Sequence, residues 1–420
     1  MNVGASENRQ VAIVLGGTSA HIPLIENLKQ RNYFTVLIDY FSNPPASKVA
    51  DYHEQQSTLD FEKVLAISQK WRASLVISTC VDQANVIAAD VSQRLKLPSS
   101  YGVETAIKLS KKSEMKKVFR DSGIPTSPFE VLVGLDKIKN LSLKYPLVVK
   151  PVDSNSSKGV KRADTQEELF LYAKEALSIS RSGEIIVEEF LPGFIVSGYF
   201  YAQGGKAHPL FNMRKYFRAS TRESVISSNA SLVHPDLTEV VKSKCFVIGQ
   251  KLVSSFGLTQ TPFFIEFMIN GNDVNVIEAA PRIGGGLGYR VSEKLLNFDL
   301  IDAAVDAHLG RAVRVPGDSD DSMFLIQNIY SLPGVFSKIQ GMDELIKNKI
   351  IEEFYCYKSE GIKIHSTLTS GERIGAMIIR GSSTVEISEK CKQAFNSLSV
   401  LGVDNEDLTI RGSYYNEQMI

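Results

Sequence analysis

The sequence predicts a mixed fold, with a parallel α/β unit at the N-terminus and α+β regions after it. Over about the first hundred residues, short apolar runs alternate with segments of helical spacing, as in parallel sheets with helices on both faces. From Pro146 onward, strand-like segments follow one another around turns. The chain has 420 residues, which is enough for roughly three domains of about 150 residues each.

The composition is that of an ordinary globular protein. Hydrophobic residues make up 43% of the chain and charged residues 22%, which argues against disorder and coiled coil. The 47 basic and 47 acidic residues give a formal net charge of zero, so no overall basic field is present to hold nucleic acid or an anionic membrane. We therefore expect neither as a partner.

Cysteine spacing and the opening residues indicate a compartment. Four cysteines lie far apart without a Cys-x-x-Cys pair, which argues against a zinc site or a disulfide framework: Cys80, Cys245, Cys356 and Cys391. The start MNVGASENRQ lacks the apolar core of a signal peptide, and no apolar run reaches the ~18 residues of a membrane span. These features are typical of the reducing cytoplasm, where we expect the protein.

The first hundred residues are expected to alternate strands and helices. Strands are predicted at 11–17, 34–39 and 73–79, and helices at 21–32 and 84–95. The segment GGTSAH (16–21) follows a strand and opens a helix, where a phosphate can bind at the helix N-terminus. It matches neither G-x-G-x-x-G nor G-x-x-x-x-G-K-[ST], and a tight strand-to-helix turn accounts for it equally well.

A basic helix, LSKKSEMKKVFRDSG (109–123), precedes a region of further strands and helices. Helices are expected at 165–177, 297–310 and 388–400. Strands are expected at 146–151, 184–193, 194–206, 334–339, 350–357, 362–367 and 373–380. The segment 261–281 is predicted to form a hairpin around the turn Asn270-Gly271-Asn272-Asp273.

The polar loop DSNSSKG (153–159) is a candidate for phosphate binding. Its small residues let backbone N–H groups approach an anion, and Lys150 and Lys158 supply positive charge. An ordinary hairpin turn is an equally good account of this loop when it is taken alone.

Glu266 and Glu278 give the sharpest functional signal. They lie on the two strands of the 261–281 hairpin, so antiparallel pairing can bring their carboxylates together on one face. Two close carboxylates in apolar strands repel unless a cation lies between them, and Mg²⁺ prefers such hard oxygen ligands. The alternative is a pair of solvent-facing acids on an edge hairpin, but the apolar surroundings FFIEFM and NVIEAAP favour a metal.

A loop with an arginine and three glycines follows the second of these carboxylates. Arg282 comes four residues after Glu278, and Gly284, Gly285 and Gly286 come shortly after it. An arginine there can neutralise developing negative charge, and the glycines allow a ligand to approach the backbone closely. The structural alternative is a flexible loop with an exposed arginine.

The order of these motifs resembles that of the ATP-grasp superfamily. GIPTSP, YPLVVKP, SNSSKG, IIVEEFLPG, FFIEFM and VIEAAPRIGGG occur in the family's order and spacing. Within the superfamily the chain looks most like the carboxylate–amine ligases, including L-amino-acid ligases, because of E-A-A-P-R-I-G-G-G and S-S-K-G-V. The resemblance implies an ATP-grasp fold with an N-terminal parallel α/β domain (1–105), an ATP-grasp domain (106–314) containing a mobile small subdomain at about 120–190, and a small C-terminal α+β domain (315–420).

The resemblance also implies roles for individual residues. Lys150 matches the lysine that holds the α- and β-phosphates of ATP, and Lys112 matches an earlier lysine, while the rest of KKSEMKK is expected to form a solvated helix face. The residues that match the loop over the phosphates are Ser156, Ser157, Lys158 and Gly159. The residues that match the adenine linker are Glu188, Glu189 and Leu191, the last two acting through backbone groups. The metal ligands and the arginine that stabilises the acyl-transfer intermediate are matched by Glu266, Glu278 and Arg282, with Mg²⁺ as the metal and Mn²⁺ as a substitute.

The sequence departs from the family pattern in two places. Phe194 and Ile195 stand where relatives usually have an acid that contacts the ribose, and Ala280 replaces an asparagine that often joins the metal site. Two side-chain ligands are therefore left for the metal, with phosphate and water oxygens to complete its shell.

Substrate residues are expected between the adenine linker and the metal hairpin. Arg214, Lys215 and Glu223 lie in this part of the chain, and an arginine there can hold a carboxylate through two hydrogen bonds. Gly285 and Gly286 are expected beside the reacting group.

The implied activity is ATP-dependent ligation of a carboxylate to an amine. Transfer of the γ-phosphoryl group gives an acyl phosphate, which the amine attacks with release of phosphate beside the ADP already formed. Small-molecule substrates are expected, and assembly as a homodimer is allowed. Two alternatives stay open: an ATP-grasp carboxylase or purine-pathway-type ligase, and an ATP-binding protein without catalysis. Retention of Glu266, Glu278 and Arg282 argues against the second, because binding ATP alone does not need that arginine.

Overall fold

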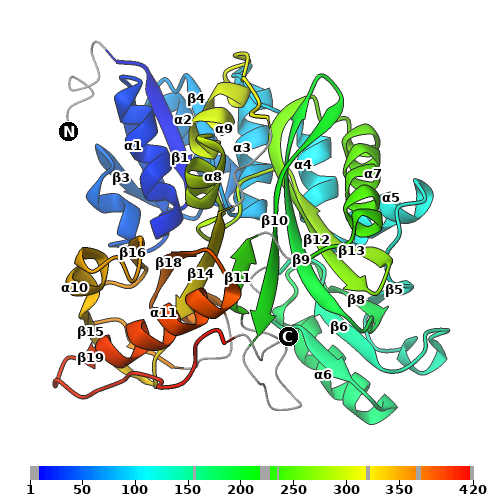
Figure 1. Ribbon diagram of the computed structural model, residues 1–420. Helices are drawn as coiled ribbons and strands as arrows, with labels where there is room; N and C mark the ends of the chain where they lie inside the picture. The colour runs from blue at the N-terminus through cyan, green and yellow to red at the C-terminus, as the bar shows by residue number, and fades with distance from the viewer. Residues whose placement is uncertain are drawn as a thin grey trace.

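The computed structural model describes residues 9–154, 158–217, 228–233, 236–317, 322–365 and 370–416. Within these residues the strands form four sheets. Figure 1 shows the N-terminal unit (blue) above the C-terminal elements (orange and red), with the long green strands of the largest sheet beside them. The predicted combination of α/β and α+β regions is confirmed.

The N-terminal unit is a parallel sheet with helices on both faces. Its elements are β1 (Val11–Leu15), α1 (Ile22–Gln30), β2 (Phe34–Asp39), β3 (Tyr52–Gln55), α2 (Phe61–Lys70), β4 (Leu75–Ile77) and α3 (Asp82–Leu95). The strand order is β3-β2-β1-β4. Side chains of β1 alternate between two apolar clusters: Ala12 and Val14 pack with α1, whereas Ile13 and Leu15 pack with α2 and α3. The predicted two-sided burial is therefore confirmed.

The basic segment expected as one helix forms two. Helices α4 (Val103–Ser110) and α5 (Lys112–Asp121) meet at Lys111, whose backbone is extended, with φ −93° and ψ 111°. At this break the Lys112 N–H donates to the carbonyl of Val152 (3.0 Å). The expectation of a single helix over 109–123 is wrong, because this contact with a distant segment interrupts it.

A small antiparallel sheet follows. Its elements are β5 (Phe129–Val133), β6 (Leu147–Pro151), β7 (Lys161–Ala163), α6 (Gln166–Ile179) and β8 (Glu184–Glu189). The strand order is β5-β8-β6-β7, and α6 covers the face that carries Leu147, Val149 and Val187. Because side chains alternate along a strand, Lys150 and Glu188 lie on the opposite face.

In the part of the chain that the structure describes, the largest sheet has eight antiparallel strands. They are, in spatial order, β13 (Asp273–Ala280), β12 (Gln260–Asn270), β9 (Phe194–Gln203), β10 (Lys206–Phe217), β11 (Ser228–Val233), β14 (Met323–Ile329), β18 (Gly375–Gly381) and β16 (Glu353–Cys356). The helix α7 (Glu239–Phe256) covers the face that carries Phe200, Ile265 and Phe267. Pairing of β11 with β14 carries the sheet into the C-terminal region.

The C-terminal elements extend this sheet and add a second, smaller one. They include β15 (Gly334–Gln340), α10 (Met342–Lys347), β17 (Lys363–Ile364), α11 (Thr384–Ser397) and β19 (Ser399–Gly402). The smaller sheet has the order β17-β15-β19. Helix α11 packs on β18, where Ile387 and Cys391 share an apolar cluster with Met377 and Ile379. The domain boundaries near 105 and 314 stay predictions.

Two helices connect the largest sheet with the N-terminal unit: α8 (Gly288–Leu296) and α9 (Leu300–His308). Arg31, just after α1, donates from Nη1 to Asp306 Oδ1 of α9 (2.6 Å) and from Nη2 to Asp302. Asn27 Nδ2 also donates to Asp302 Oδ1 (2.9 Å). These bonds fix the N-terminal unit against the largest sheet, where it forms one wall of the site.

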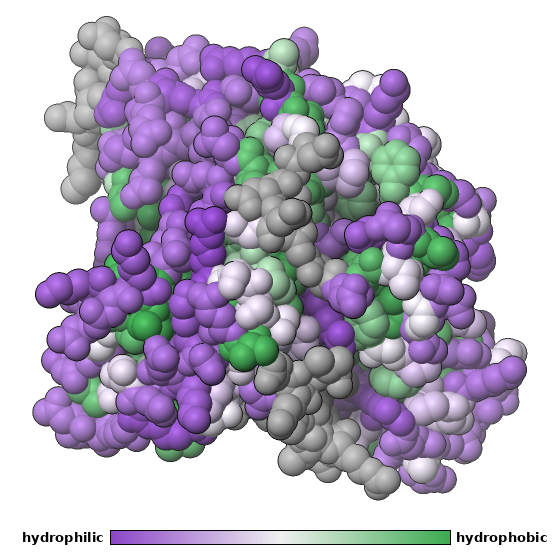
Figure 2. All heavy atoms as spheres, in the orientation of Figure 1, coloured by the Kyte–Doolittle hydropathy of each residue, from purple (hydrophilic) through white to green (hydrophobic). Residues whose placement is uncertain are grey.

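The molecular surface is mainly hydrophilic on the face that Figure 2 shows, with apolar side chains in scattered groups. None of the helices in the described ranges has the length and apolar character needed to cross a membrane.

Two buried histidines predict a stability change in weak acid. Burial lowers the pKa of His21 and of His308 from 6.5 to about 4. Below pH 6.5 the unfolded chain therefore binds protons that the folded protein does not, and the free energy of unfolding should fall as the pH drops toward 4. We expect a loss of about 2 kcal/mol per histidine between pH 7.5 and 5.

Urea unfolding at the two pH values tests this expectation. His308→Gln should lose less stability on acidification than the wild type, whereas His365→Gln, at an exposed position, should behave like the wild type. An equal loss in the wild type and His308→Gln would contradict the assignment.

Candidate functional site

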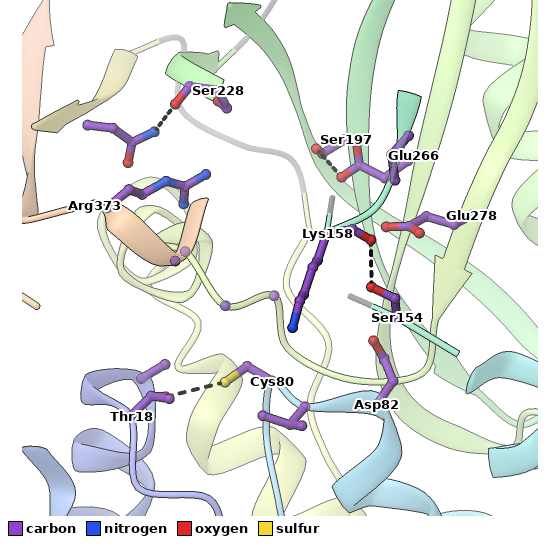
Figure 3. A pocket seen from close by; sticks show the side chains of 18 of the residues that line it. Thr18, Cys80, Asp82, Ser154, Lys158, Ser197, Ser228, Glu266, Glu278 and Arg373 are labelled. Atoms are coloured by element: carbon purple, nitrogen blue, oxygen red, sulfur yellow. Dashed lines mark hydrogen bonds between the residues drawn. The ribbon is translucent and has the colours of Figure 1, made fainter. Parts of the chain in front are cut away.

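A cavity of about 1590 Å³ lies where the N-terminal unit, the small antiparallel sheet, the eight-stranded sheet and the C-terminal elements meet. Figure 3 shows side chains from all of these parts around it, among them Asp82, Lys158, Glu266 and Arg373. Ligand pockets commonly measure about 300–1,000 Å³. The cavity therefore has room for more than one small ligand.

The hairpin of β12 and β13 places two carboxylates side by side in this cavity. Glu266 and Glu278 are direct register partners, which confirms the predicted pairing, and a β-bulge follows immediately after Glu266. Glu266 is buried, with Oε1 accepting from Ser197 Oγ (2.8 Å) and Oε2 lying 2.7 Å from Lys215 Nζ. In the described residues no third acidic, histidine or cysteine side chain completes a metal-type cluster. These two carboxylates are thus the side chains in the described residues that could bind a metal ion here.

A buried group of two lysines and one glutamate forms the wall beside the small sheet. Glu188 Oε1 lies 2.6 Å from Lys150 Nζ, and Glu188 Oε2 lies 2.9 Å from Lys116 Nζ. Ser127 Oγ also donates to Glu188 Oε2 (2.6 Å). Burial disfavours ionisation of Glu188, but the two ammonium groups outweigh it and lower the pKa of this carboxyl below its ordinary value.

Lys116 is the member of this group that the sequence analysis missed. It was expected on a solvated helix face, yet it is 1% exposed, so that expectation is wrong for this residue. Burial lowers the pKa of Lys116, while attraction to Glu188 opposes the shift. Phe119 lies three residues later, on the same buried face of α5, and this spacing is the sequence signal that could have indicated the burial of Lys116.

Three further residues that were predicted to bind phosphate lie at the cavity or in the polar loop 153–159 beside it. Lys112 and Lys158 line the cavity, and Lys112 Nζ donates to the carbonyl of Ser154 (2.5 Å). Gly159 has φ +75°, and a Cβ there would lie 2.8 Å from Ile179, so a larger residue would not fit without a shift. Ser156 and Ser157 lie outside the described residues.

The predicted adenine linker borders the same wall. Glu189 and Leu191 line the cavity, and the Glu189 N–H donates to the carbonyl of Pro128 (3.0 Å). The Glu189 side chain accepts from the Lys144 N–H (3.0 Å). Ile195, in one of the two places where the sequence departs from the family pattern, also lines the cavity.

Arg282 lines the cavity and pairs with an acid that the sequence did not indicate. Its Nε and Nη2 atoms lie 2.5 Å and 2.7 Å from the two carboxylate oxygens of Asp82, at the start of α3. Burial opposes protonation of Arg282, but attraction to Asp82 outweighs it and raises the pKa of the guanidinium. Asp82 is 200 residues away in sequence, so no local pattern could have revealed the pair.

The glycine-rich loop after β13 meets the N-terminal unit. Gly284, Gly285 and Gly286 line the cavity, and a Cβ on Gly285 would lie 3.6 Å from the Cβ of Cys80. The segment 16–20 lines the cavity from the other side, held by the Gly17 N–H donating to Asp39 Oδ2 (2.7 Å). The GGTSAH segment is a tight turn leading into a single 3-10 turn at Ser19–His21.

The predicted substrate residues separate in the structure. Lys215 lines the cavity, whereas Arg214, its neighbour on β10, lies with its guanidinium 4.2 Å from the ring centre of Phe194, outside the cavity lining. Strand alternation explains the difference, since adjacent residues face opposite sides. Glu223 lies outside the described residues.

The C-terminal elements add two cations that the sequence analysis did not single out. Lys358 and Arg373 line the cavity; Lys358 Nζ donates to the carbonyl of Gly371 (2.6 Å), and Arg373 Nε donates to Tyr330 Oη (3.1 Å). Figure 3 shows Arg373 near Ser228 at the edge of the site. Their position depends on the pairing of β18 with β14, which no local motif announces.

The ion pair between Arg282 and Asp82 yields a stability prediction. Their side chains are only 12% and 20% exposed, so Asp82→Asn should leave a poorly solvated guanidinium and cost about 2 kcal/mol of unfolding free energy. Asp82→Asn, Arg282→Met and the double variant form a cycle whose coupling should exceed about 1 kcal/mol. Asp90→Asn, on the same helix, is the control. A coupling near zero would show that the pair does not join the two segments.

Comparison with known proteins gives two family matches. Residues 143–290 match the model of the ATP-grasp domain, and residues 329–401 match L-amino acid ligase C-terminal domain 2. A curated relative, formate-dependent phosphoribosylglycinamide formyltransferase of Erythrobacter litoralis, is 26% identical over 311 residues, covering 70% of this chain and 76% of its own.

Solved structures agree with these matches. L-amino acid ligase from Bacillus licheniformis superimposes with a TM-score of 0.79 at 19% identity, covering 94% of this chain and 99% of that one. Phosphoribosylglycinamide synthetase from Anaerococcus prevotii gives 0.73 at 18% identity, covering 94% and 100%. The predicted ATP-grasp fold is confirmed, and residues 143–290 of this chain form a domain that matches the ATP-grasp family.

Proposed function

We propose that the protein is an ATP-dependent ligase that joins a carboxylate to an amine, with ADP and phosphate as products. The observation that carries this proposal is the convergence of Lys150, the facing pair of Glu266 and Glu278, and Arg282 on one cavity. Phosphoryl transfer needs mainly positioning and charge neutralisation, which these groups can supply. The match to an L-amino acid ligase domain at 329–401 supports amino acids as substrates.

The nucleotide is assigned to the small-sheet side of the cavity. Its phosphates would be held by three lysines that line this side: Lys112, Lys150 and Lys158. The base would lie against the segment 188–191, where Val148, Leu191 and Met268 offer apolar surface within the same cavity.

The carboxylates of Glu266 and Glu278 fit a divalent cation, with Mg²⁺ the expected ion. Lys215 beside Glu266 shows that this acid already lies next to a positive charge. Oxygen ligands on neighbouring strands suit a hard cation that completes its shell with phosphate and water oxygens. When bound, the metal would neutralise phosphate charge.

The reaction would run through two displacements. A substrate carboxylate oxygen attacks the γ-phosphorus, the bond to the bridging oxygen breaks, and ADP leaves. The amine nitrogen then attacks the acyl carbon, the bond from that carbon to phosphate breaks, and the nitrogen loses a proton. Arg282, held in the cavity by Asp82, would stabilise the negative charge on the acyl oxygen, and the backbone at Gly285 and Gly286 would lie beside it.

A purine-pathway-type ligase is the second candidate, because curated relatives are formate-dependent phosphoribosylglycinamide formyltransferases. Formate is also a carboxylate, so both candidates share the chemistry and differ in substrate. To distinguish them, ADP release is measured with pairs of amino acids and, separately, with formate and amine acceptors.

Isotope transfer tests the proposed chemistry. If the carboxylate attacks the γ-phosphorus, one of its oxygens must end in the released phosphate. With an ¹⁸O-labelled carboxylate, an amine, ATP and Mg²⁺, we expect labelled phosphate and ADP, measured by mass spectrometry. Unlabelled phosphate beside the amide product, or AMP with pyrophosphate, would rule out an acyl phosphate.

Glu278→Gln tests the metal assignment. Loss of one carboxylate should lower Mg²⁺-dependent turnover roughly 100-fold or more, because the amide is a much weaker ligand for a hard cation. Asp273→Asn, at the first residue of β13 beside the hairpin turn, is the matched control and should keep wild-type turnover. Full activity in correctly folded Glu278→Gln would remove this residue from the site.

A further inference from the structure

Lys116 lies behind the cavity wall, where its ammonium group is hydrogen-bonded to other protein groups. Its side chain is 2% exposed, and it is not among the residues that line the cavity. Its Nζ donates to Glu188 Oε2 (2.9 Å), Ser127 Oγ (3.1 Å) and the Thr126 hydroxyl. It therefore acts on any ligand through Glu188 and not by direct contact.

The two carboxylate oxygens of Glu188 have different partners. Oε2 accepts hydrogen bonds from Lys116, which lies behind the cavity wall, and from Ser127, which lines the cavity. Oε1 lies toward Lys150, and both of these side chains line the cavity. Both oxygens are thus held by ion pairs, and the buried Oε1 is the one whose lysine partner lines the cavity.

We propose that Lys116 is a positioning residue that sets the base specificity of the nucleotide site. By holding Glu188 ionised and in one orientation, it makes the site select a base with an amino group, such as adenine, over a base with a carbonyl group at the same position. The inference rests on the proposed function, in which the segment 188–191 borders the base.

The selection follows from hydrogen-bond chemistry. An ionised carboxylate can only accept, so it pairs with the 6-amino group of adenine and repels the 6-carbonyl oxygen of hypoxanthine. A protonated carboxyl group could donate to that carbonyl and would lose the distinction. Burial favours the protonated form, and the charge of Lys116 works against burial.

Lys150 alone does not keep Glu188 ionised when a nucleotide is bound. It faces the cavity and is the lysine assigned to the phosphates, so its charge is shared with the ligand once a nucleotide binds. The hydrogen bonds of Lys116 in the described part of the chain all go to protein groups, and its side chain does not line the cavity. The ionisation of Glu188 in the bound state therefore depends on Lys116.

The test compares binding of ADP and IDP, in which the 6-amino group and N1 acceptor of adenine are replaced by the 6-carbonyl group and N1–H donor of hypoxanthine. Isothermal titration calorimetry of the full chain gives the ratio of the two Kd values without any turnover. The wild type should prefer ADP, and Lys116→Met should reduce this preference roughly tenfold, the weight of one charge-assisted hydrogen bond. Lys117→Met, which removes the adjacent lysine with a 48% exposed side chain, is the matched control and should keep the wild-type ratio.

A second variant provides the same test if Lys116→Met does not fold. Lys116→Gln keeps a hydrogen-bond donor toward Glu188 while removing the charge, so it should also reduce the preference if charge is the cause. A wild-type Kd ratio in a folded Lys116→Met or Lys116→Gln protein overturns the inference.

The pH dependence separates this role from simple packing. The charged groups around Glu188 are Lys116 from α5 and Lys150 from β6, and Glu278 of β13 interacts electrostatically with Lys116. Without Lys116 the pKa of Glu188 should rise, so the preference for ADP should weaken as the pH falls from 7.5 to 5.5. The wild-type ratio should stay constant, and a flat ratio in Lys116→Met would overturn the proposal. Failure of the wild type to bind ADP at all would instead refute the proposed function.

Discussion

Backbone pairing of β12 with β9 on one side and β13 on the other is the constraint on which the site depends. Glu266 stands opposite Ser197 of β9 and opposite Glu278 of β13. The flanking residues Ile265 and Phe267 fill the apolar cluster under α7. A slip of one residue would exchange Glu266 for these apolar side chains, so the packing beneath α7 also fixes the carboxylates in the cavity.

Charge compensation between distant segments completes the cavity. Glu188 of β8 is held from α5 and β6, Glu266 from β10, and Arg282 from α3. A buried charge without its partner is strongly unfavourable, so these ions are stable only when the elements have docked. Assembly of the site and assembly of the tertiary structure are therefore the same event.

Local patterns sufficed for part of this arrangement. The facing of Glu266 and Glu278 follows from a short turn and strand alternation, and Lys150 follows from a strand that ends in a polar loop. Asp82 and Arg373 could not be found in this way, since each reaches the cavity through contacts between remote segments. Lys116 and Lys117 look alike in sequence, and only the direction in which α5 packs distinguishes the buried lysine from the exposed one. The break at Lys111 likewise depends on the distant carbonyl of Val152.

The continuity of the largest sheet limits how this chain can be recombined with its relatives. A chimaera that exchanges residues beyond 315 must supply a new β14, because β11 pairs with that strand along one edge. If the replacement strand carries a different register or side-chain size, the backbone of β11 is left open and can recruit a strand from another molecule. Exchanging the cavity wall that carries Lys358 and Arg373 therefore requires redesign of the sheet beneath it, or the chimaera will lose solubility.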